Sequence, residues 1–535
     1  MNAPSAPAEK SGEDAGARLW PWVLPGFLVC LVAISRQSLW IDEAFMAAKA
    51  SQPTLADWRQ AMLEGGGSDL QMPLYMIYVW GFAKIFGLSE WALRAANIPW
   101  FVVGVAAFIR VAPQPQRLAV ALVTLAAPFA WYYLNEARPY AMQLGMSLLI
   151  FAALYHLSRS VLTPWQETGW FAAFCFGLFA LCGSSLLGVI WAGAALLCAP
   201  FLFSFKRLWA LSGRHKFAGL FTCLLLAVLG GYYIWTLKLG ARALPAGTAD
   251  AENPALVTMR AAANFRTGLA GRTDPRNLAF LVYELLGLGG LGPGRMEIRE
   301  GGLSVFRPYL IPLLIYALVL GDFLRLAVLR LGQSSTGARW FGVALMLILP
   351  MALLLGAGYF LHFRVLGRHF TPIVPVLLFL LSVGLAMRWS RRGWISRLVV
   401  LIFFIMSVDS CLSFRFAARH EKDDYRDAAA AANAALRRGE RVWWSADTHG
   451  AVYYHLPLNA GTNEVNGAFL ALNMTPDMLS HLPEPDLIVV SKPDLYDSRG
   501  TLAQYIQRGS YVKSATPQAF TIWGRKDQMR DQRKD

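Results

Sequence analysis

The chain has 535 residues, of which 56% are apolar and only 16% are charged. Soluble globular proteins carry roughly 45–50% apolar and about 25% charged residues. This composition, with a mean hydropathy of +0.41, excludes a disordered chain, a disulfide scaffold and a coiled coil, and it predicts a membrane protein. The net charge of +15 would suggest nucleic acid in a soluble protein. In a membrane protein it fits basic cytoplasmic loops, so we expect no nucleic-acid partner.

The chain begins with residues 1–18, which are rich in Ala, Pro, Ser, Gly and charge and which we expect to form a disordered cytoplasmic tail. A membrane span needs about 20 mostly apolar residues. Eleven segments are candidate spans: Trp20–Arg36, Trp91–Ile109, Leu118–Tyr133, Tyr140–Leu157, Trp170–Ser184, Leu186–Phe203, Phe217–Leu237, Pro308–Phe323, Trp340–Phe360, Phe370–Met387 and Leu398–Phe414. We interpret the first as an uncleaved signal anchor, because no convincing cleavage site accompanies it.

A twelfth apolar run, Pro73–Phe86, is shorter, opens with a proline and carries Lys84. We expect it to form an interfacial or half-buried helix that does not cross the membrane. The N-terminal tail then shares a side with the later connectors. If the run did cross, the N-terminus would lie outside and the loop after the first span would face the cytoplasm.

The charges of the short connectors orient the chain. Five of them together hold 14 Lys or Arg and one acidic residue: Arg110–Arg117, Ser158–Glu167, Ser204–Lys216, Leu324–Arg339 and Arg388–Arg397. The positive-inside rule places such connectors in the cytoplasm. The predicted transmembrane domain, 19–414, then sends its large loops 37–89 and 238–307 to the outer face, with the tail 415–535. We expect any chemistry on that face.

The tail 415–535 differs from the rest because it mixes charged residues with turn residues. Asp423–Arg438 is rich in alanine and predicts a helix that ends at Gly439. Four short segments are predicted strands, the last two as a hairpin: Arg441–Ser445, Asp486–Ser491, Tyr511–Ser514 and Ala519–Trp523. Strands that alternate with helices predict a small α/β domain.

Two adjacent carboxylates, Asp42 and Glu43, follow the first span directly. Ionisable groups are costly to bury at a membrane and often mark function. We therefore take both as candidate catalytic residues, and the alternative is an interfacial loop with solvated acids. Further along the same loop, Asp69 precedes the Pro73–Phe86 run.

The second outer loop is short and holds Glu136 and Arg138 among several aromatic residues. Arg138 lies on the face where the charge rule gives no reason for a cation, so it is a candidate for binding phosphate or sugar. The alternative is that Arg138 pairs with Glu136 or reaches toward lipid headgroups.

A later short outer loop carries Arg364 and Arg368 together with His362 and His369. This loop departs most clearly from the positive-inside trend. Arginine binds phosphate with two parallel hydrogen bonds, so the two arginines are candidate ligands of a lipid phosphate. Ordinary anchoring to headgroups is the alternative.

Several features occur in a distinctive order: a span that ends in Asp42-Glu43, a helix that opens Pro73-Leu74-Tyr75, a span with Leu93-Arg94, the stretch Glu136–Ala141, the turn Gly367–Phe370 and the tail segment Asp424–Ala429. This order resembles that of the bacterial GT-C glycosyltransferases, relatives of the protein O-mannosyltransferases and of the lipid A aminoarabinose transferase. The resemblance is good over residues 20–160 and architectural beyond them. Two departures are Gln71–Leu74, where the family often has His-Pro-Pro-Leu, and a second loop without a clear Asp-x-Asp.

The resemblance implies an α-helical polytopic membrane protein of the GT-C type, with about eleven transmembrane helices and a C-terminal α/β domain in the periplasm. It implies a hexosyl- or pentosyltransferase of the bacterial inner membrane, which moves a sugar from a polyprenyl-phosphate donor to a lipid A, glycan or protein acceptor. Such a transfer needs a carboxylate base for the acceptor hydroxyl and cations that stabilise the departing phosphate.

Asp42 is the expected base, and Glu43 is expected to orient it. We expect Glu136 and Arg138 beside the sugar or phosphate of the donor, Arg364 and Arg368 at the lipid phosphate, and inversion at the anomeric carbon. Metal use stays open: divalent cations favour several oxygen ligands, and the candidate ligands are Asp42, Glu43 and Glu136.

Three other functions compete with this hypothesis. A transporter or lipid flippase usually keeps ionisable residues near the middle of its spans, whereas Asp322 and Asp409 lie toward span ends. A non-catalytic scaffold could use the large tail to bind a partner. A glycan ligase or polymerase would use the same lipid-linked substrates with a different fold.

Overall fold

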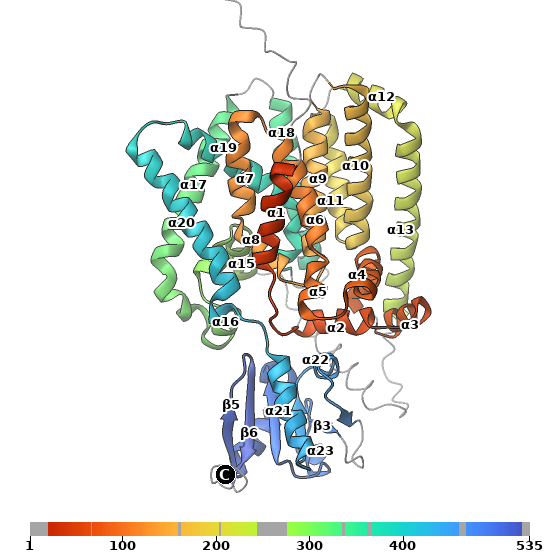
Figure 1. Ribbon diagram of the computed structural model, residues 1–535, viewed down its shortest axis with the longest axis vertical. Helices are drawn as coiled ribbons and strands as arrows, with labels where there is room; N and C mark the ends of the chain where they lie inside the picture. Colours follow the sequence, from red (N-terminus) through yellow and green to blue (C-terminus); the bar gives the residue numbers. More distant parts are fainter. Residues whose placement is uncertain are drawn as a thin grey trace, which may run out of the picture.

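The computed structural model describes residues 20–65, 67–158, 162–202, 205–242, 275–333, 337–360, 365–459 and 467–526. Figure 1 shows a bundle of long helices and, beyond one end of it, a domain built around a small sheet. The predicted tail 1–18 and the predicted site residue Arg364 lie outside the described residues.

Each of the eleven predicted spans falls on helix. Nine of them lie largely on the helices α1 (Trp20–Ala33), α9 (Tyr140–Leu157), α10 (Pro164–Ser184), α11 (Gly188–Leu202), α13 (Lys216–Arg242), α17 (Leu310–Gly332), α18 (Gly337–Phe360), α19 (Val374–Trp389) and α20 (Trp394–Phe416). The span Trp91–Ile109 covers α5 (Glu90–Ala95) and most of α6 (Ile98–Val111). The other, Leu118–Tyr133, is divided between α7 (Gln114–Leu125) and α8 (Pro128–Leu134), which meet at 46°. The bend falls at Pro128, because proline cannot continue a helix from the preceding turn.

The chain is a multi-pass membrane protein. Within the described residues, eight helices are long and apolar enough to cross a membrane, or nine if α7 and α8 form one span. The predicted number of about eleven also includes α1 and α11, which are apolar but have 14 and 15 residues. A 14-residue helix is about 21 Å long, whereas the hydrocarbon core is about 30 Å thick.

Short elements gather at the end of the bundle nearest the sheet, where Figure 1 shows α2, α3 and α16. These elements are α2 (Ile41–Ala50), α3 (Leu55–Gly65), η2 (Gly67–Gln71), α4 (Pro73–Phe86), α5 (Glu90–Ala95), α15 (Pro275–Leu285), η3 (Leu288–Leu291), α16 (Arg295–Gly301), η4 (Gly302–Tyr309), η5 (Gly367–Ile373) and η6 (Ala418–His420). The helix α4 corresponds to the twelfth apolar run of the sequence. With 14 residues it is as long as α1. Tyr75 and Val79 bury one of its faces against the bundle.

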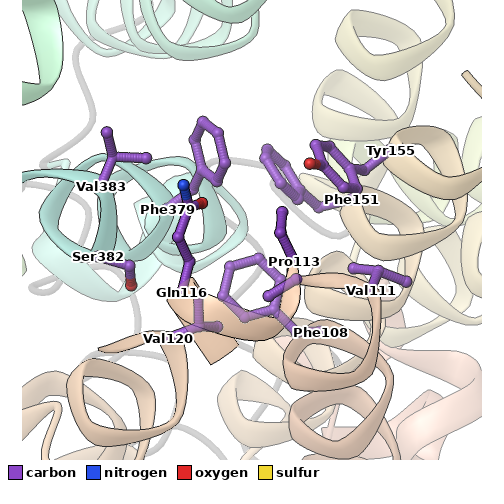
Figure 2. A pocket seen from close by; sticks show the side chains of 11 residues that line it. Phe108, Val111, Pro113, Gln116, Val120, Phe151, Tyr155, Phe379, Ser382 and Val383 are labelled. Carbon is purple, nitrogen blue, oxygen red and sulfur yellow. The ribbon is translucent and has the colours of Figure 1, made fainter. Parts of the chain in front are cut away.

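The opposite end of the bundle carries the basic connector helix α12 (Phe205–Arg214). A pocket opens between the ends of α6, α7, α9 and α19, and Figure 2 shows Phe108, Phe151 and Phe379 around it. Its polar lining is limited to Gln116, Tyr155 and Ser382, without a charged side chain. This pocket is therefore suited to an apolar ligand and not to acid–base chemistry.

Two glycines allow α6 and α9 to lie in close contact. A Cβ added at Gly104 would lie 2.2 Å from the carbonyl oxygen of Gly145, and one at Gly145 would lie 2.1 Å from that of Trp100. Small residues at such contacts are typical of helix packing in membranes, where backbones approach closely.

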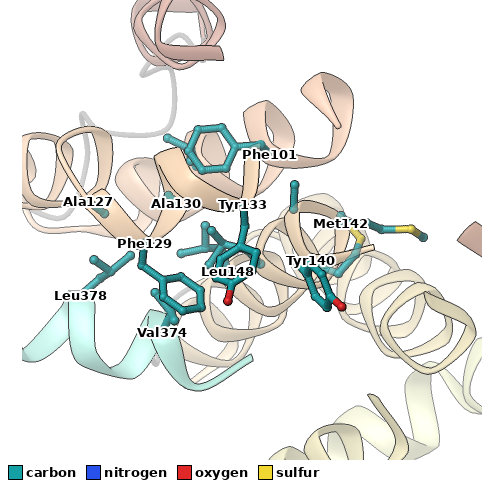
Figure 3. Packing of buried hydrophobic residues seen from close by; sticks show 14 of the residues in the cluster. Phe101, Ala127, Phe129, Ala130, Tyr133, Tyr140, Met142, Leu148, Val374 and Leu378 are labelled. Atoms are coloured by element: carbon teal, nitrogen blue, oxygen red, sulfur yellow. The ribbon is translucent and has the colours of Figure 1, made fainter. Parts of the chain in front are cut away.

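Aromatic side chains fill the core next to this contact. Figure 3 shows Phe129, Tyr133 and Tyr140 between α8, α9 and α19. The Tyr133 ring centroid lies 4.6 Å from that of Phe129 and 5.1 Å from that of Tyr140. Because Tyr133 and Tyr140 flank the second outer loop, their packing anchors both ends of that loop.

The tail forms a six-stranded sheet in the order β2-β3-β1-β4-β6-β5. Its strands are β1 (Val442–Ser445), β2 (Leu458–Asn459), β3 (Ala468–Leu470), β4 (Leu487–Ser491), β5 (Tyr511–Ala515) and β6 (Phe520–Arg525), and its helices are α21 (Tyr425–Arg437), α22 (Thr448–Tyr453), α23 (Pro476–Ser480), α24 (Pro493–Tyr496) and α25 (Thr501–Arg508). The first four strands in this order are parallel, and β6 is antiparallel to β4 and β5. The predicted α/β fold is confirmed, including the helix before Gly439 and the terminal hairpin.

Candidate functional site

The helix α2 begins one residue before the predicted acid pair, so Asp42 and Glu43 both lie in its first turn. Acidic residues are favoured there by the helix dipole. The Glu43 carboxylate also accepts a hydrogen bond from the Trp40 N–H at 3.4 Å. Because neighbours on a helix point about 100° apart, the two carboxylates face different surroundings.

Glu43 lies at the end of the bundle nearest the sheet and is fully buried. Its two oxygens accept hydrogen bonds from Nε and Nη2 of Arg94, at 3.0 and 2.7 Å. Oε1 also accepts from the Ala137 N–H at 2.7 Å and from Nζ of Lys422 at 3.0 Å. With the Trp40 N–H, five donors thus converge on one carboxylate.

These donors keep Glu43 ionised. Burial by itself raises the pKa of a carboxyl group, but the positive charges of Arg94 and Lys422 and their hydrogen bonds outweigh it and lower the pKa of Glu43 to about 2. A carboxylate that is fully engaged and this acidic is a poor proton acceptor near neutral pH. The geometry favours a role in positioning.

A second buried cluster lies beside the first. Asp69, which is 1% exposed, pairs with Lys49 at 2.8 Å and with Arg138 at 2.9 Å. Arg138 also donates to the carbonyl oxygen of Asp42 at 3.2 Å. Burial would raise the pKa of Asp69, but Arg138 and Lys49 lower it. The loop that carries Arg138 is therefore tied to the first loop at two places, Asp42 and Asp69.

Asp42 points toward the late loop. Its Oδ2 lies 3.2 Å from Nη1 of Arg368, and the two side chains are 23% and 20% exposed. The guanidinium of Arg368 also lies over the rings of Trp40 and Tyr140, at 5.9 and 5.7 Å from their centroids. Asp42 is thus held near a cation in a half-buried position.

A further cation, Arg295 at the start of α16, lies near the same Trp40 ring. Its guanidinium lies 4.8 Å from the Tyr132 ring centroid and 5.9 Å from that of Trp40. Its distance to the Glu284 carboxylate is 3.8 Å, and its side chain is 51% exposed. Arg295 and Arg368 therefore flank the same indole ring, with positive charge available to an anion.

Glu136 is 1% exposed, and its Oε2 is a buried oxygen without a hydrogen-bond partner. Burial raises the pKa of Glu136, although the charges of Lys422 and Arg295 oppose the rise. Other buried polar atoms of this region also have no partner, namely Trp40 Nε1, Arg138 Nε and Arg368 Nε. Buried polar atoms are nearly always satisfied, so this concentration is typical of a place that receives a polar ligand or water.

The structure brings five of the six predicted site residues together: Asp42, Glu43, Glu136, Arg138 and Arg368. Arg364 lies outside the described residues. Sequence reasoning did not assign a role to five other residues of this region: Lys49, Asp69, Arg94, Arg295 and Lys422. Leu93-Arg94 was noted only for its family resemblance, and the position of Asp69 before α4 was noted without a partner.

The three candidate metal ligands do not form a cation site. In the described ranges, no three His, Cys, Asp or Glu side chains gather in a way that could hold a metal ion. Glu43 is surrounded by Arg94 and Lys422, and these two cations would repel a metal.

This arrangement, with carboxylates and arginines at one end of a polytopic bundle and an α/β domain against that end, has the GT-C fold. Two solved structures share it, both of ArnT from Cupriavidus metallidurans, one bound to undecaprenyl phosphate and one in the apo state. The chain superposes on each with a TM-score of 0.53, at 14% and 13% identity, over 94% of this chain and 97% of the other. No family model and no curated protein matches the sequence.

Proposed function

We propose that the protein is a membrane glycosyltransferase that moves a sugar from a polyprenyl-phosphate donor to an acceptor at the outer face. The observation that carries the proposal is the Asp42–Arg368 pair, with Oδ2 and Nη1 3.2 Å apart. It joins a proton acceptor to a phosphate-binding cation, and partnerless buried polar atoms surround it. The fold shared with ArnT, of which one structure holds undecaprenyl phosphate, supports the choice of donor.

The reaction proposed is a single displacement at the anomeric carbon. The acceptor hydroxyl oxygen forms a bond to this carbon while the bond to the phosphate oxygen breaks. The hydroxyl proton passes to the Asp42 carboxylate, which acts as general base. The polyprenyl phosphate leaves with the electron pair of the broken bond, so the configuration at the anomeric carbon inverts.

Arg368 and Arg295 are assigned to the phosphate of the donor. Both guanidinium groups lie within 5.9 Å of the Trp40 ring centroid, and this shared neighbour supports assigning both to one phosphate beside that ring. Cations that are fixed in advance stabilise the charge that develops on the leaving group without reorganisation. In this proposal Glu136 contacts the sugar, and Arg138 fixes the second outer loop through Asp69 and the Asp42 carbonyl.

Glu43 is assigned to positioning and not to proton transfer. Its bonds to Arg94 and Ala137 fix the first turn of α2 against α5 and the second outer loop. Asp42 is the preceding residue in that turn, so its direction is set by the same contacts. The site then faces the periplasm of a bacterial inner membrane, and the acceptor is lipid A, a glycan or a protein.

The test compares wild type with Asp42→Asn in membranes that are supplied with a panel of radiolabelled polyprenyl-phosphate sugars. Label that enters glycolipid, glycan or protein fractions is counted at equal expression. We expect a loss of about 100-fold or more, as is usual when a general base is removed. The control is Asp477→Asn, whose side chain is 86% exposed in the tail and which should match wild type.

Three results contradict the proposal. Equal transfer by Asp42→Asn and wild type would remove Asp42 as the base. No transfer by wild type from any donor in the panel would reject a transferase of this donor class. Retention of the donor configuration in the product would reject the single displacement.

A further inference from the structure

The chain leaves the last long helix, α20, across the outer end of the bundle. Arg419 donates hydrogen bonds to the carbonyl oxygens of Gly290 and Gly292, at 2.9 and 3.0 Å. These bonds hold the first segment of the tail against η3. The residues that follow are consequently directed toward the site instead of into solvent.

Lys422 is the residue of this segment that enters the site. Its Nζ donates to Oε1 of Glu43 at 3.0 Å and to the carbonyl oxygen of Asn135, and its side chain is 10% exposed. One ammonium group thereby links the first turn of α2 to the second outer loop. The residue lies 379 positions from Glu43 in the chain, so only the fold brings them together.

The tail also packs against α2, through residues that lie between α2 and the sheet. Figure 1 shows α22 between the sheet and α2. The ring of His449 on α22 lies edge-on to Phe45 of α2, with 4.3 Å between centroids. Ile41, the first residue of α2, is buried in the core of the tail, and Tyr454 accepts a hydrogen bond from the Leu39 N–H at 2.8 Å. The helix that carries Asp42 is thus packed between bundle and tail.

The charge of Lys422 is not needed to neutralise Glu43. Arg94 already pairs with both oxygens of that carboxylate. A buried second cation has a desolvation cost that a neutralised pair does not offset. The remaining partner is the loop that starts at Asn135, which carries Glu136 and Arg138, and this points to a role in placing that loop.

We propose that Lys422 is a positioning residue of the transfer site, supplied by the tail. It fixes the Asn135–Arg138 loop against the first turn of α2, so that Glu136 and Asp42 face the same substrate. In this proposal the α/β tail contributes a positioning residue to the active site. The inference rests on the proposed function, because it assigns the tail a role in the same reaction.

The test uses the full chain with Lys422→Met, which keeps a similar length without the charge, and Lys422→Arg, which restores a cation. The control is Lys513→Met, an exposed lysine on β5. Three quantities are measured for each purified protein: the thermal unfolding midpoint, the binding of undecaprenyl phosphate, and the kcat and KM of transfer with the donor that wild type uses.

We expect Lys422→Met to lower kcat about tenfold or more. The unfolding midpoint should stay that of wild type, and the affinity for undecaprenyl phosphate should stay within about twofold of wild type. Lys422→Arg should recover part of kcat, and Lys513→Met should match wild type. A merely structural lysine would lower the unfolding midpoint and weaken the binding together with kcat, which would overturn the proposal.

Two further outcomes separate this proposal from the one it rests on. If wild type binds undecaprenyl phosphate and transfers sugar, but Lys422→Met does both equally well, only the role of Lys422 is rejected. If wild type neither binds this lipid nor transfers from any donor, the proposed function and the role of Lys422 fail together.

Discussion

The carboxylate of Glu43 and the guanidinium of Arg94 form a buried ion pair with two hydrogen bonds, and both side chains are 0% exposed. Arg94 also donates to the carbonyl oxygens of Ser35, Gln37 and Ser38, at 3.1, 2.7 and 3.1 Å. The pair therefore fixes the turn between the first span and α2. The direction of Asp42 depends on it.

Glu43→Gln should destabilise the protein, because the substitution leaves the buried Arg94 without its counter-charge. Breaking a buried pair by removal of one charge costs about 3–5 kcal/mol. We expect a lower thermal unfolding midpoint in detergent, whereas Glu64→Gln, at an exposed position on α3, should not change it. An unchanged midpoint for Glu43→Gln would show that the pair does not support the fold.

The contribution of Glu43 should depend on pH. The pKa of Glu43 is about 2 in the folded protein, against an ordinary value of 4.5. A carboxyl group whose folded pKa is the lower one stabilises the protein above the unfolded value, and this contribution is lost as the pH falls through the folded value. The stability difference between wild type and Glu43→Gln should shrink as the pH falls from about 4.5 toward 2. A difference that stays constant over this window contradicts the assignment.

The cations near Trp40 should govern binding of the donor phosphate. Arg295→Gln and Arg368→Gln each remove one guanidinium, and hydrogen bonds to charged groups are worth about 1.5–3 kcal/mol. We expect the affinity for undecaprenyl phosphate to fall at least about tenfold for each. Arg307→Gln, an exposed arginine on η4, is the matched control. Binding that does not change in the first two variants would exclude these arginines from the phosphate site.

The close contact between α6 and α9 should not tolerate a side chain in place of the hydrogen of Gly145. Gly145→Ala places a Cβ about 2 Å from the Trp100 carbonyl oxygen, so the helices have to separate. We expect a lower unfolding midpoint and less folded protein in membranes. Gly193→Ala, on α11 with no atom within 4 Å of the added Cβ, serves as the comparison. Equal stability of the two variants would argue against the close contact.

The orientation of the tail is open to a direct test. Because the basic connectors lie at the end of the bundle opposite the sheet (Figure 1), the positive-inside rule places the tail outside the cytoplasm. A reporter that is active only outside the cytoplasm, fused after Asp535, should be active. A fusion at Arg392, in the connector before α20, should be inactive. The reverse pattern would invert the topology.

The spans were predictable because each is a long apolar segment, and the bilayer requires every backbone group in it to be bonded within the segment. The helix α9 has the predicted bounds, Tyr140–Leu157. The terminal hairpin and the helix before Gly439 follow from local signals in the same way. The strands β2 and β3, with two and three residues, are too short to leave such a signal.

The sequence by itself determined the class of the protein, the helices of the bundle and the α/β character of the tail, since hydropathy and turn residues act over short stretches. It also marked Asp42, Glu43, Glu136, Arg138 and Arg368 as residues of interest. Only the tertiary structure decided how Asp42 and Glu43 differ. The two residues are neighbours in the chain, but on α2 their side chains point in different directions. Asp42 pairs with Arg368, and Glu43 pairs with Arg94.

The tertiary structure alone also brought Lys422, Arg295 and Lys49 to the site. The residues next to a charged side chain in a loop do not indicate its partner, because Coulomb attraction depends on distance in space and not on separation along the chain. The burial that makes these contacts strong arises only when bundle and tail pack together.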